Sequence, residues 1–170
     1  MKETGIFYGT SSGKTEEIAL RIHQRLGEEI TRIQDIAGSS AEDLMSYRSL
    51  ILGIPTWGIG ELQEDWLDFL PALGGLDMSG IKAALFGLGD QESYPDTFAN
   101  ALGTLYDSLL KAGCQVIGNC SPEGYAFTKS KALREGMFVG LVLDEENQSH
   151  LTDARIDSWL NGILPVLRQA

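Results

Sequence analysis

Residues 6–15 read Ile-Phe-Tyr-Gly-Thr-Ser-Ser-Gly-Lys-Thr, an apolar run followed by a turn rich in glycine and hydroxyl side chains. The apolar run predicts a buried strand, and the residues from Lys14 to Leu26 repeat apolar side chains at helical spacing. The segment is therefore predicted to form a strand, a turn and the start of a helix. Unpaired backbone N–H groups and the positive end of the helix dipole make that helix N-terminus favourable for an anion.

The residues of this turn have side chains that suit a bound phosphate. Gly9 and Gly13 allow a tight turn and a close approach of a ligand to the backbone. Thr10, Ser12 and Thr15 can contribute hydroxyl donors. The candidate phosphate site comprises Thr10, Ser11, Ser12, Gly13, Lys14 and Thr15.

Two alternatives remain open for this turn. One is that Ser12 or Gly13 only caps the helix. The second is the P-loop of nucleotide hydrolases, whose pattern is G-x-x-x-x-G-K-[ST]. The segment from Gly9 to Thr15 has one residue fewer between its glycines than that pattern. The shorter turn favours a single terminal phosphate over a diphosphate.

The overall composition is that of an ordinary globular protein, and the simplest expectation is one domain over residues 1–170. Hydrophobic residues make up 43% and charged residues 22%. The formal net charge of −11 argues against nucleic acid and anionic membranes as partners and favours a basic protein partner. A simpler reason for the charge is solubility alone.

The remaining sequence features predict a cytoplasmic protein without a metal site. The chain opens directly into its first strand with no signal peptide, and no apolar stretch is long enough to cross a bilayer. Cys114 and Cys120 do not belong to a metal-ligand pattern, so we expect two reduced thiols, with Cys114 buried. His23 and His150 have no partner motif for catalysis and are expected at the surface.

Strand and helix patterns alternate along the chain, which predicts a parallel sheet in a doubly wound α/β fold. The predicted strands are Gly5–Tyr8, Ile30–Ile36, Leu50–Ile54, Lys82–Gly87 and Gln115–Gly118, and the run Phe138–Leu143 resumes as a strand after a polar and aromatic loop over residues 119–136. The predicted helices are Lys14–Leu26, Ala41–Met45, Gln63–Leu70, Phe98–Ala112 and Asp153–Leu167. Pro55 is expected to end the third strand.

In such folds a ligand lies beyond the carboxyl ends of the strands. The loops Thr10–Thr15, Pro55–Glu61 and Leu88–Tyr94 should therefore share one site. Trp57 and Tyr94, facing each other across this site, would sandwich a flat ring beside the phosphate. The alternative is that the two aromatic side chains only pack the loops together.

The same loops resemble those of flavodoxins. The resemblance is carried by Phe7–Thr10, Gly13–Thr15, Pro55–Trp57, Phe86–Gln91, Tyr94, Gly124–Tyr125, Ser130–Leu133, Phe138–Leu141 and Asp144–Ser149, and it covers essentially the whole chain. It implies a flavodoxin-like three-layer fold with a five-stranded parallel sheet in the order 2-1-3-4-5. Flavodoxins are a standard example of this topology and bind FMN at the switch point of the sheet. The interruption of the last strand over residues 119–136 resembles the insertion of long-chain flavodoxins.

The resemblance also implies roles for individual residues. The turn from Thr10 to Thr15 would hold the FMN phosphate, and Trp57 and Tyr94 would stack on opposite faces of the isoalloxazine ring. Asp90 is a candidate acceptor for the ring N3–H. The remaining cofactor-binding residues would bond or line the edge of the ring: Pro55, Thr56, Gly58, Ile59, Leu88 and Gly89. Ser12 stands where the family usually has threonine, which keeps the hydroxyl.

The implied function is a low-potential one-electron carrier rather than an enzyme. The family presents a backbone carbonyl at the residue after the tryptophan, here Gly58, to the flavin N5–H, and glycine adopts the required positive φ at little cost. Carboxylates near the ring should disfavour the second electron, so FMN is expected to shuttle between semiquinone and hydroquinone. These carboxylates are Glu61, Glu64, Asp65, Asp90 and Glu92. The protein is expected to be a monomer that docks basic redox proteins, such as a flavodoxin/ferredoxin-NADP reductase, and low-potential acceptors.

Two further functions are weighed against this one. A flavodoxin-like NAD(P)H-dependent quinone reductase needs a second pocket for the hydride donor, and no segment of this sequence suggests one. A receiver-type signalling domain needs an acidic pair after the first strand and an aspartate after the third, where Tyr8-Gly9 and Ile54-Pro55 stand instead.

Overall fold

The main sheet of the computed structural model, which describes residues 4–169, has the strand order β2-β1-β3-β5-β6. The parallel strands are β1 (Thr4–Tyr8), β2 (Thr31–Asp35), β3 (Ser49–Trp57), β5 (Lys82–Leu88), β6 (Gln115–Ile117) and β9 (Leu141–Leu143). β6 pairs with the first half of β5 and β9 with its second half, so together they form the interrupted edge strand. The predicted α/β fold and strand order are confirmed.

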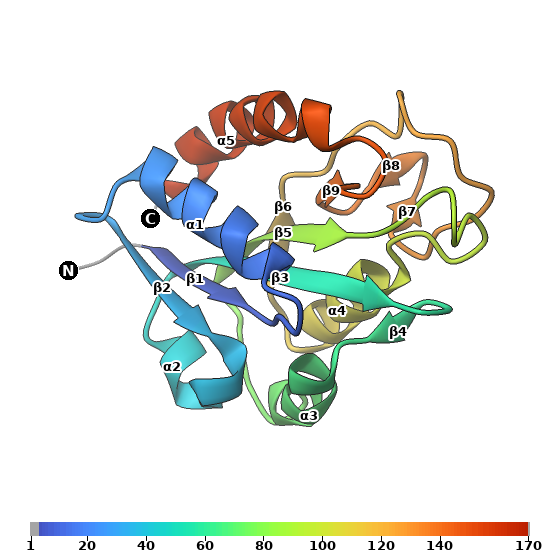
Figure 1. Ribbon diagram of the computed structural model, residues 1–170. Coiled ribbons are helices and arrows are strands. Elements are labelled where there is room, and N and C mark those ends of the chain that lie inside the picture. Colours follow the sequence, from blue (N-terminus) through green and yellow to red (C-terminus); the bar gives the residue numbers. More distant parts are fainter. Residues whose placement is uncertain (1–3, 170) are drawn as a thin grey trace.

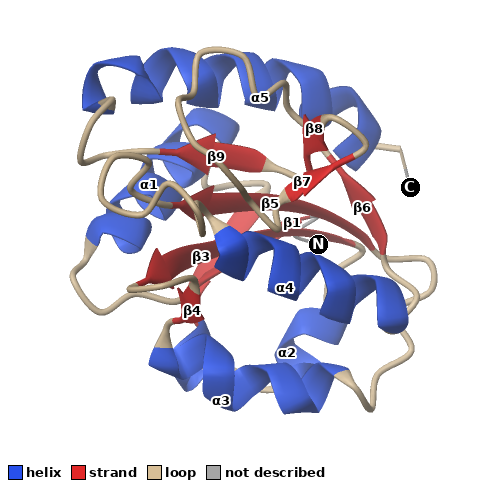
Figure 2. Cartoon of the chain, turned by 90° about the vertical axis from the view of Figure 1, so that its right-hand side faces the viewer, coloured by secondary structure: helices blue, strands red, loops and turns tan. Residues whose placement is uncertain are grey.

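Helices cover both faces of this sheet (Figures 1 and 2). On one face lie α1 (Lys14–Leu26) and α5 (Thr152–Leu167), and on the other lie α2 (Ala41–Met45), α3 (Glu64–Leu73) and α4 (Asn100–Lys111). Short 3₁₀ helices span Ile36–Gly38 and Ser149–Leu151. Because side chains alternate along a strand, Ile6 of β1 packs beneath α1 and α5 while Phe7 packs on the opposite side.

Most predicted boundaries agree within two residues, and α1 and α2 agree fully. The prediction that Pro55 ends its strand is wrong, because β3 continues to Trp57. β1 pairs with β3 only as far as Gly53, so position 55 lies beyond this pairing. Proline, which has no backbone N–H, therefore costs no hydrogen bond to β1 there. The prediction that the third helix ends at Leu70 is also wrong, because α3 includes Pro71 and continues to the fully buried Leu73.

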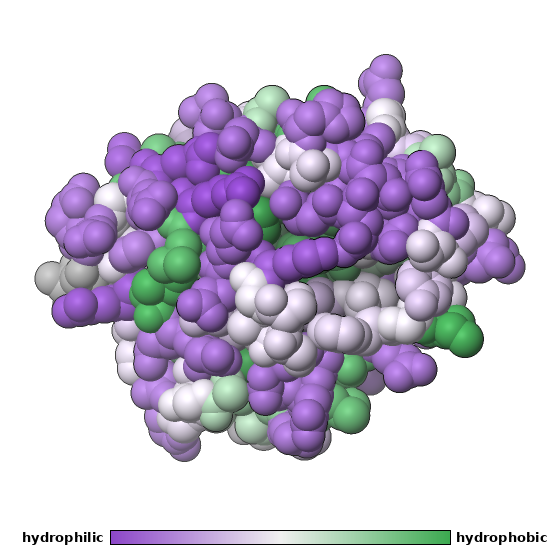
Figure 3. All heavy atoms as spheres, viewed as in Figure 1, coloured by the Kyte–Doolittle hydropathy of each residue, from purple (hydrophilic) through white to green (hydrophobic). Residues whose placement is uncertain are grey.

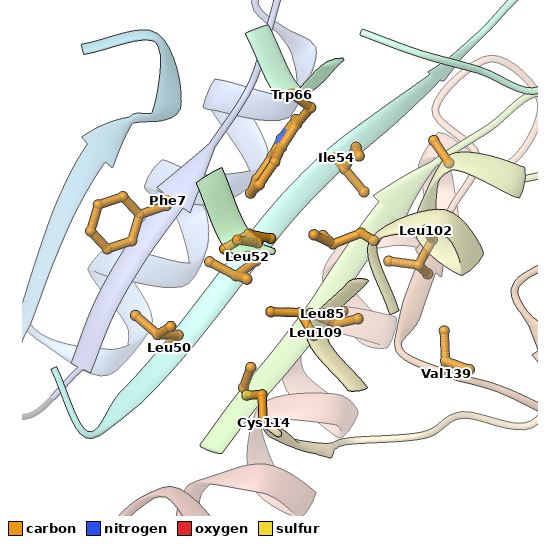
Figure 4. Packing of buried hydrophobic residues seen from close by; sticks show 14 of the residues in the cluster. Phe7, Leu50, Leu52, Ile54, Trp66, Leu85, Leu102, Leu109, Cys114 and Val139 are labelled. Carbon is orange, nitrogen blue, oxygen red and sulfur yellow. The ribbon is translucent and has the colours of Figure 1, made fainter. Parts of the chain in front are cut away.

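The core beneath α3 is organised around Trp66, which is completely buried (Figure 4). Its indole Nε1 donates to the carbonyl of Gly53 at 2.8 Å. A Cβ at Gly53 would lie 2.1 Å from the Phe86 ring, so only glycine fits at this point of β3. The hydrogen bond from Trp66 holds α3 against the middle of the sheet, while Phe86 packs on the opposite face, beneath α1 and α5.

The insertion between β6 and β9 is more ordered than predicted. It contains an antiparallel hairpin of β7 (Leu133–Arg134) and β8 (Met137–Phe138). The expected continuous strand Phe138–Leu143 is therefore wrong: Phe138 belongs to this hairpin and only Leu141–Leu143 joins the sheet. The two parts separate at Gly140, where a Cβ would lie 2.2 Å from the Leu85 carbonyl oxygen.

An aromatic cluster anchors the insertion to the rest of the protein. Phe98, which precedes α4, lies within 5.3–6.3 Å, between ring centroids, of Tyr125, Phe127 and Phe138. The Tyr125 hydroxyl also donates to the carbonyl of Val142 in β9. The insertion thereby covers the outer edge of β9.

Cys114 is buried, as the sequence analysis expected. Both thiols are free, and burial raises the pKa of Cys114 and of Cys120 to about 11, which makes each a poor nucleophile near neutral pH.

Among residues 4–169, none of the helices combines the length and apolarity that a bilayer crossing requires. Hydrophilic side chains cover most of the face shown in Figure 3.

Two helical glycines provide a test of how closely the insertion packs. A Cβ at Gly103 in α4 would lie 2.3 Å from the backbone oxygen of Lys131, whereas one at Gly162 in α5 would meet nothing within 4 Å. We expect Gly103→Ala to lower the free energy of unfolding by about 1–3 kcal/mol through overpacking. The matched variant Gly162→Ala should raise it by roughly 0.5–1 kcal/mol through helix propensity. Urea denaturation measures both, and a stabilised Gly103→Ala would show that the insertion is not held against α4.

Candidate functional site

The carboxyl ends of β1, β3 and β5 converge on one pocket of about 320 Å³. It is lined by Thr10, Ser11, Ser12, Lys14, Thr15, Pro55, Thr56, Trp57, Gly58, Leu88, Gly89, Asp90, Tyr94, Glu145 and Glu146. The pocket thus contains all the predicted site residues except Gly13 and Ile59. The three predicted loops do share a site, as their positions at one edge of a parallel sheet require.

The turn after β1 presents an uncapped helix N-terminus to this pocket. Gly13 is the N-cap of α1, with a left-handed φ of +89° and no side-chain hydrogen bond to the helix. Its backbone N–H donates instead to the Thr10 hydroxyl at 2.9 Å, which closes the turn. Ser12 does not cap the helix, so its exposed hydroxyl and the first-turn N–H groups of α1 can face an anion.

Gln63 holds the turn after β1 through hydrogen bonds, a role that the sequence analysis did not predict. It is 2% exposed, and its Nε2 donates to the Thr10 carbonyl at 3.3 Å and to the Ser11 hydroxyl at 3.1 Å. Its Oε1 accepts from the backbone N–H of Trp66 at the start of α3. Gln63 therefore links the turn to α3, and only its position as the first residue of a predicted helix could have indicated this.

Gly9 has a packing role that the sequence analysis did not predict. A Cβ at Gly9 would lie 2.5 Å from both Gln63 and Trp66. A glycine is therefore required here by the close approach of these two side chains. The absence of a side chain at Gly9 lets the buried tryptophan and the turn occupy neighbouring positions.

Two aromatic side chains flank the open part of the pocket. Trp57, at the end of β3, and Tyr94, in the loop after β5, are each 42% exposed. β4 (Glu61–Leu62) pairs antiparallel with the end of β3, and Gly58 and Gly60 both have positive φ in the turn between them. Ile59, at the tip of this turn, is 75% exposed and outside the pocket lining.

Asp90 is held as an ionised acceptor at the pocket edge. Partial burial raises the pKa of its carboxyl, but hydrogen bonds from the Ser93 backbone N–H and the Asn147 side chain outweigh that effect and lower the pKa below its usual value. The Tyr94 backbone N–H donates to the Asp90 carbonyl at 2.9 Å. The position of Asp90 is thus coupled to that of Tyr94.

The loop after β9 adds two carboxylates that the sequence analysis did not place in the site. Glu145 and Glu146 line the pocket, and Glu146 forms an ion pair with Lys14 in which both side chains are about half exposed. The loop follows β9, which pairs in parallel with β5, so its residues also lie at the carboxyl edge of the sheet. The sequence analysis expected a strand here but did not place the loop after it in the site.

Larger hollows lie elsewhere but lack this convergence of groups. One of about 490 Å³ lies between α5 and the insertion, and one of about 710 Å³ lies between α4 and the β7–β8 hairpin. Both border Ile117 and Gly118 at the edge of the sheet, away from the three loops. No group of three or more potential metal ligands occurs among residues 4–169.

Comparison with known proteins identifies the family. The family model described as Flavodoxin matches residues 6–159. The chain belongs to the flavodoxin family. A flavodoxin from a Nostoc species is 46% identical over 159 residues, which cover 94% of each chain. Flavodoxin 1 of Escherichia coli K12 is 46% identical over 164 residues, covering 96% of this chain and 93% of its own.

A solved structure of another family member has the same fold throughout. The crystal structure of Fusobacterium nucleatum flavodoxin bound to flavin mononucleotide matches with a TM-score of 0.92 and 33% identity, covering 98% of this chain and 99% of that chain. The likeness extends over the insertion as well as the sheet, because almost the whole of both chains is covered. The flavodoxin resemblance inferred from the loop motifs is therefore confirmed.

The support of the turn by Gln63 can be tested by mutation. We expect Gln63→Ala to lower the free energy of unfolding by about 1–3 kcal/mol, because the Trp66 N–H and the Thr10 carbonyl each lose a largely buried partner. Gln24→Ala, at an exposed position of α1, is the matched control and should change it by less than about 0.5 kcal/mol. Equal effects in the two variants, measured by urea denaturation, would contradict the supporting role.

Proposed function

We propose that this flavodoxin-family chain is a low-potential, one-electron carrier that acts through non-covalently bound FMN. The observation that carries the proposal is the convergence of an anion-binding turn, two half-exposed aromatic side chains and a hydrogen-bonding loop on one pocket. This set of donors and apolar surfaces fits the phosphate and the flat ring of FMN. When bound, FMN supplies the electron chemistry, and the protein tunes it. Residues 1–170 act as one FMN-binding domain.

The turn after β1 binds the phosphate. Backbone N–H groups of Ser11, Ser12, Lys14 and Thr15 and the hydroxyls of Thr10, Ser12 and Thr15 are the proposed donors. Gly13, whose own N–H bonds Thr10, shapes the turn, and the dipole of α1 adds a favourable field. The Lys14 ammonium is paired with Glu146, so most of its charge is compensated within the protein. Phosphate recognition therefore depends mainly on neutral donors.

Trp57 and Tyr94 bind the two faces of the ring, and the loops around them bind its edge. The edge contacts are assigned to Pro55, Thr56, Gly58, Ile59, Leu88, Gly89 and Asp90. The Thr56 hydroxyl already accepts the backbone N–H of Ala101 at 3.2 Å, which fixes its orientation at the pocket floor. Asp90, whose carboxyl pKa is lowered by its hydrogen bonds, would accept the hydrogen bond of the ring N3–H.

The charges around the pocket oppose the addition of negative charge to the ring. Glu145 and Glu146 join Asp90 in the pocket lining, and Lys14 is the only Lys or Arg in that lining as the structure describes it. These carboxylates would make added negative charge on a bound flavin unfavourable, and would thereby lower the potential of a couple that adds it. Each ~59 mV of a one-electron couple corresponds to a tenfold change in its equilibrium constant.

The partners of a flavodoxin are redox proteins, and we propose that those of this chain are basic. They include a flavodoxin/ferredoxin-NADP reductase as donor and low-potential acceptors. The formal net charge of −11 favours rapid association with such proteins. A cytoplasmic monomer suits this role, since brief docking needs the open edge of the pocket to be accessible.

The central test is an anaerobic redox titration of the FMN-loaded protein followed by visible absorption. We expect two resolved one-electron steps with the second at low potential. Gly58→Ala should lower the potential of the first couple by on the order of 50 mV, because a Cβ resists the positive φ needed to aim the carbonyl at N5–H. A single two-electron step in the wild type, or bleaching by NADPH with no reductase added, would contradict the carrier function.

The docking proposal is tested separately by ionic strength. The rate constant for reduction of a basic redox partner should fall by at least about tenfold between 10 and 300 mM salt, because screening weakens attraction between opposite charges. An uncharged small-molecule reductant is the control and should react at a nearly constant rate. A salt-independent protein reaction measured by stopped flow would remove the electrostatic docking.

A further inference from the structure

Asp144 is a completely buried carboxylate at the end of β9. It takes part in none of the ion pairs found among residues 4–169. Its partners are neutral donors: Gln91 donates its backbone N–H at 3.0 Å and its Nε2 at 2.7 Å, and Asn147 donates its backbone N–H at 3.1 Å. A buried charge is costly without such bonds, so this network must be maintained for the loop to fold.

Asn147 connects this buried carboxylate to the pocket. Its Nδ2 donates to Asp90 Oδ1 at 2.8 Å and to Asp144 Oδ2 at 2.9 Å. One side-chain amide therefore bridges two carboxylates that come from different loops. Because Asp144 is immobilised by its other bonds, the amide holds the Asp90 carboxylate in one orientation.

Gln91 extends the same network into the insertion. It is 3% exposed, and while its Nε2 binds Asp144, its Oε1 accepts the backbone N–H of Ala126 at 2.6 Å. The residue next to Asp90 is thus tied both to the loop after β9 and to the insertion. The network around Asp90 therefore joins three segments that meet only in the folded chain.

We propose that Asn147 is a positioning residue that orients the Asp90 carboxylate toward the flavin ring from the buried anchor of Asp144. The inference rests on the proposed function, in which Asp90 accepts the ring N3–H. An amide suits this role because it fixes a carboxylate without neutralising its charge. A lysine in the same place would also hold Asp90 but would add a positive charge beside the ring.

The test is a double-mutant cycle on FMN affinity, measured by quenching of flavin fluorescence on titration into apoprotein. Asn147→Ala should raise the Kd for FMN roughly three- to tenfold, the range expected for loss of an orienting hydrogen bond to a charged group. In an Asp90→Ala background the same change should alter the Kd less than twofold, since no carboxylate remains to be oriented. A loss of affinity that depends on the presence of Asp90 indicates positioning, whereas a general structural effect of Asn147→Ala would appear equally in both backgrounds.

Two further variants control for misfolding and for nonspecific effects of mutation in this loop. Asn147→Ser retains a short hydroxyl beside Asp144 but cannot reach Asp90, so it should reproduce the weaker affinity if the alanine variant folds poorly. Gln148→Ala is the matched control, because the Gln148 side chain bonds Gly124 and Arg155 but neither carboxylate. Its Kd for FMN should stay within twofold of the wild type.

The outcomes distinguish this inference from the function on which it rests. A wild-type apoprotein that does not bind FMN would remove both. If the wild type binds FMN, the inference alone is overturned by an unchanged Kd in Asn147→Ala and Asn147→Ser, by an unchanged Kd in Asp90→Ala, or by equal losses in the two backgrounds of the cycle.

Discussion

The parallel pairing of β1, β3 and β5 is the constraint on which the rest of this structure depends. Pairing of Ile6 with Ile51, and of Ile51 with Ala84, places the ends of all three strands at one edge. The backbone N–H of Gly9 still donates to the Gly53 carbonyl beyond the last pair, so the first loop leaves the sheet beside the second. The groups that the first three loops contribute to the pocket follow from this register, and those of the loop after β9 follow from the pairing of β9 with β5.

Two glycines make room for aromatic rings within this register. Trp66 reaches the Gly53 carbonyl across the position of Gly9, and a side chain at either glycine would collide with a ring. The same tryptophan lies one turn from Gln63, which supports the phosphate turn. The packing of the core beneath α3 and the geometry of the phosphate turn are therefore coupled through Trp66 and Gln63.

The electrostatic character of the site comes from carboxylates held by neutral donors. Asp90 and Asp144 share the amide of Asn147, and Gln91 adds further N–H groups. The protein thereby orients acidic groups without cancelling their charge. That arrangement suits a carrier that must keep a bound cofactor strongly reducing, since a cation at the same place would stabilise the reduced form.

Local pattern was sufficient for much of this protein. Features that depend on residues adjacent in sequence could be recognised without coordinates. They include the helical spacing from Lys14 to Leu26, the glycine-rich turn before it, and the loops that carry Trp57 and Tyr94.

Tertiary contacts decided the rest. Glu145 and Glu146 reach the pocket because β9, which precedes them, pairs with β5. Pro55 is tolerated because β1 has already ended. The bridge from Asn147 to Asp90 joins residues far apart in the chain, and only the packing of three loops could bring them within hydrogen-bonding distance.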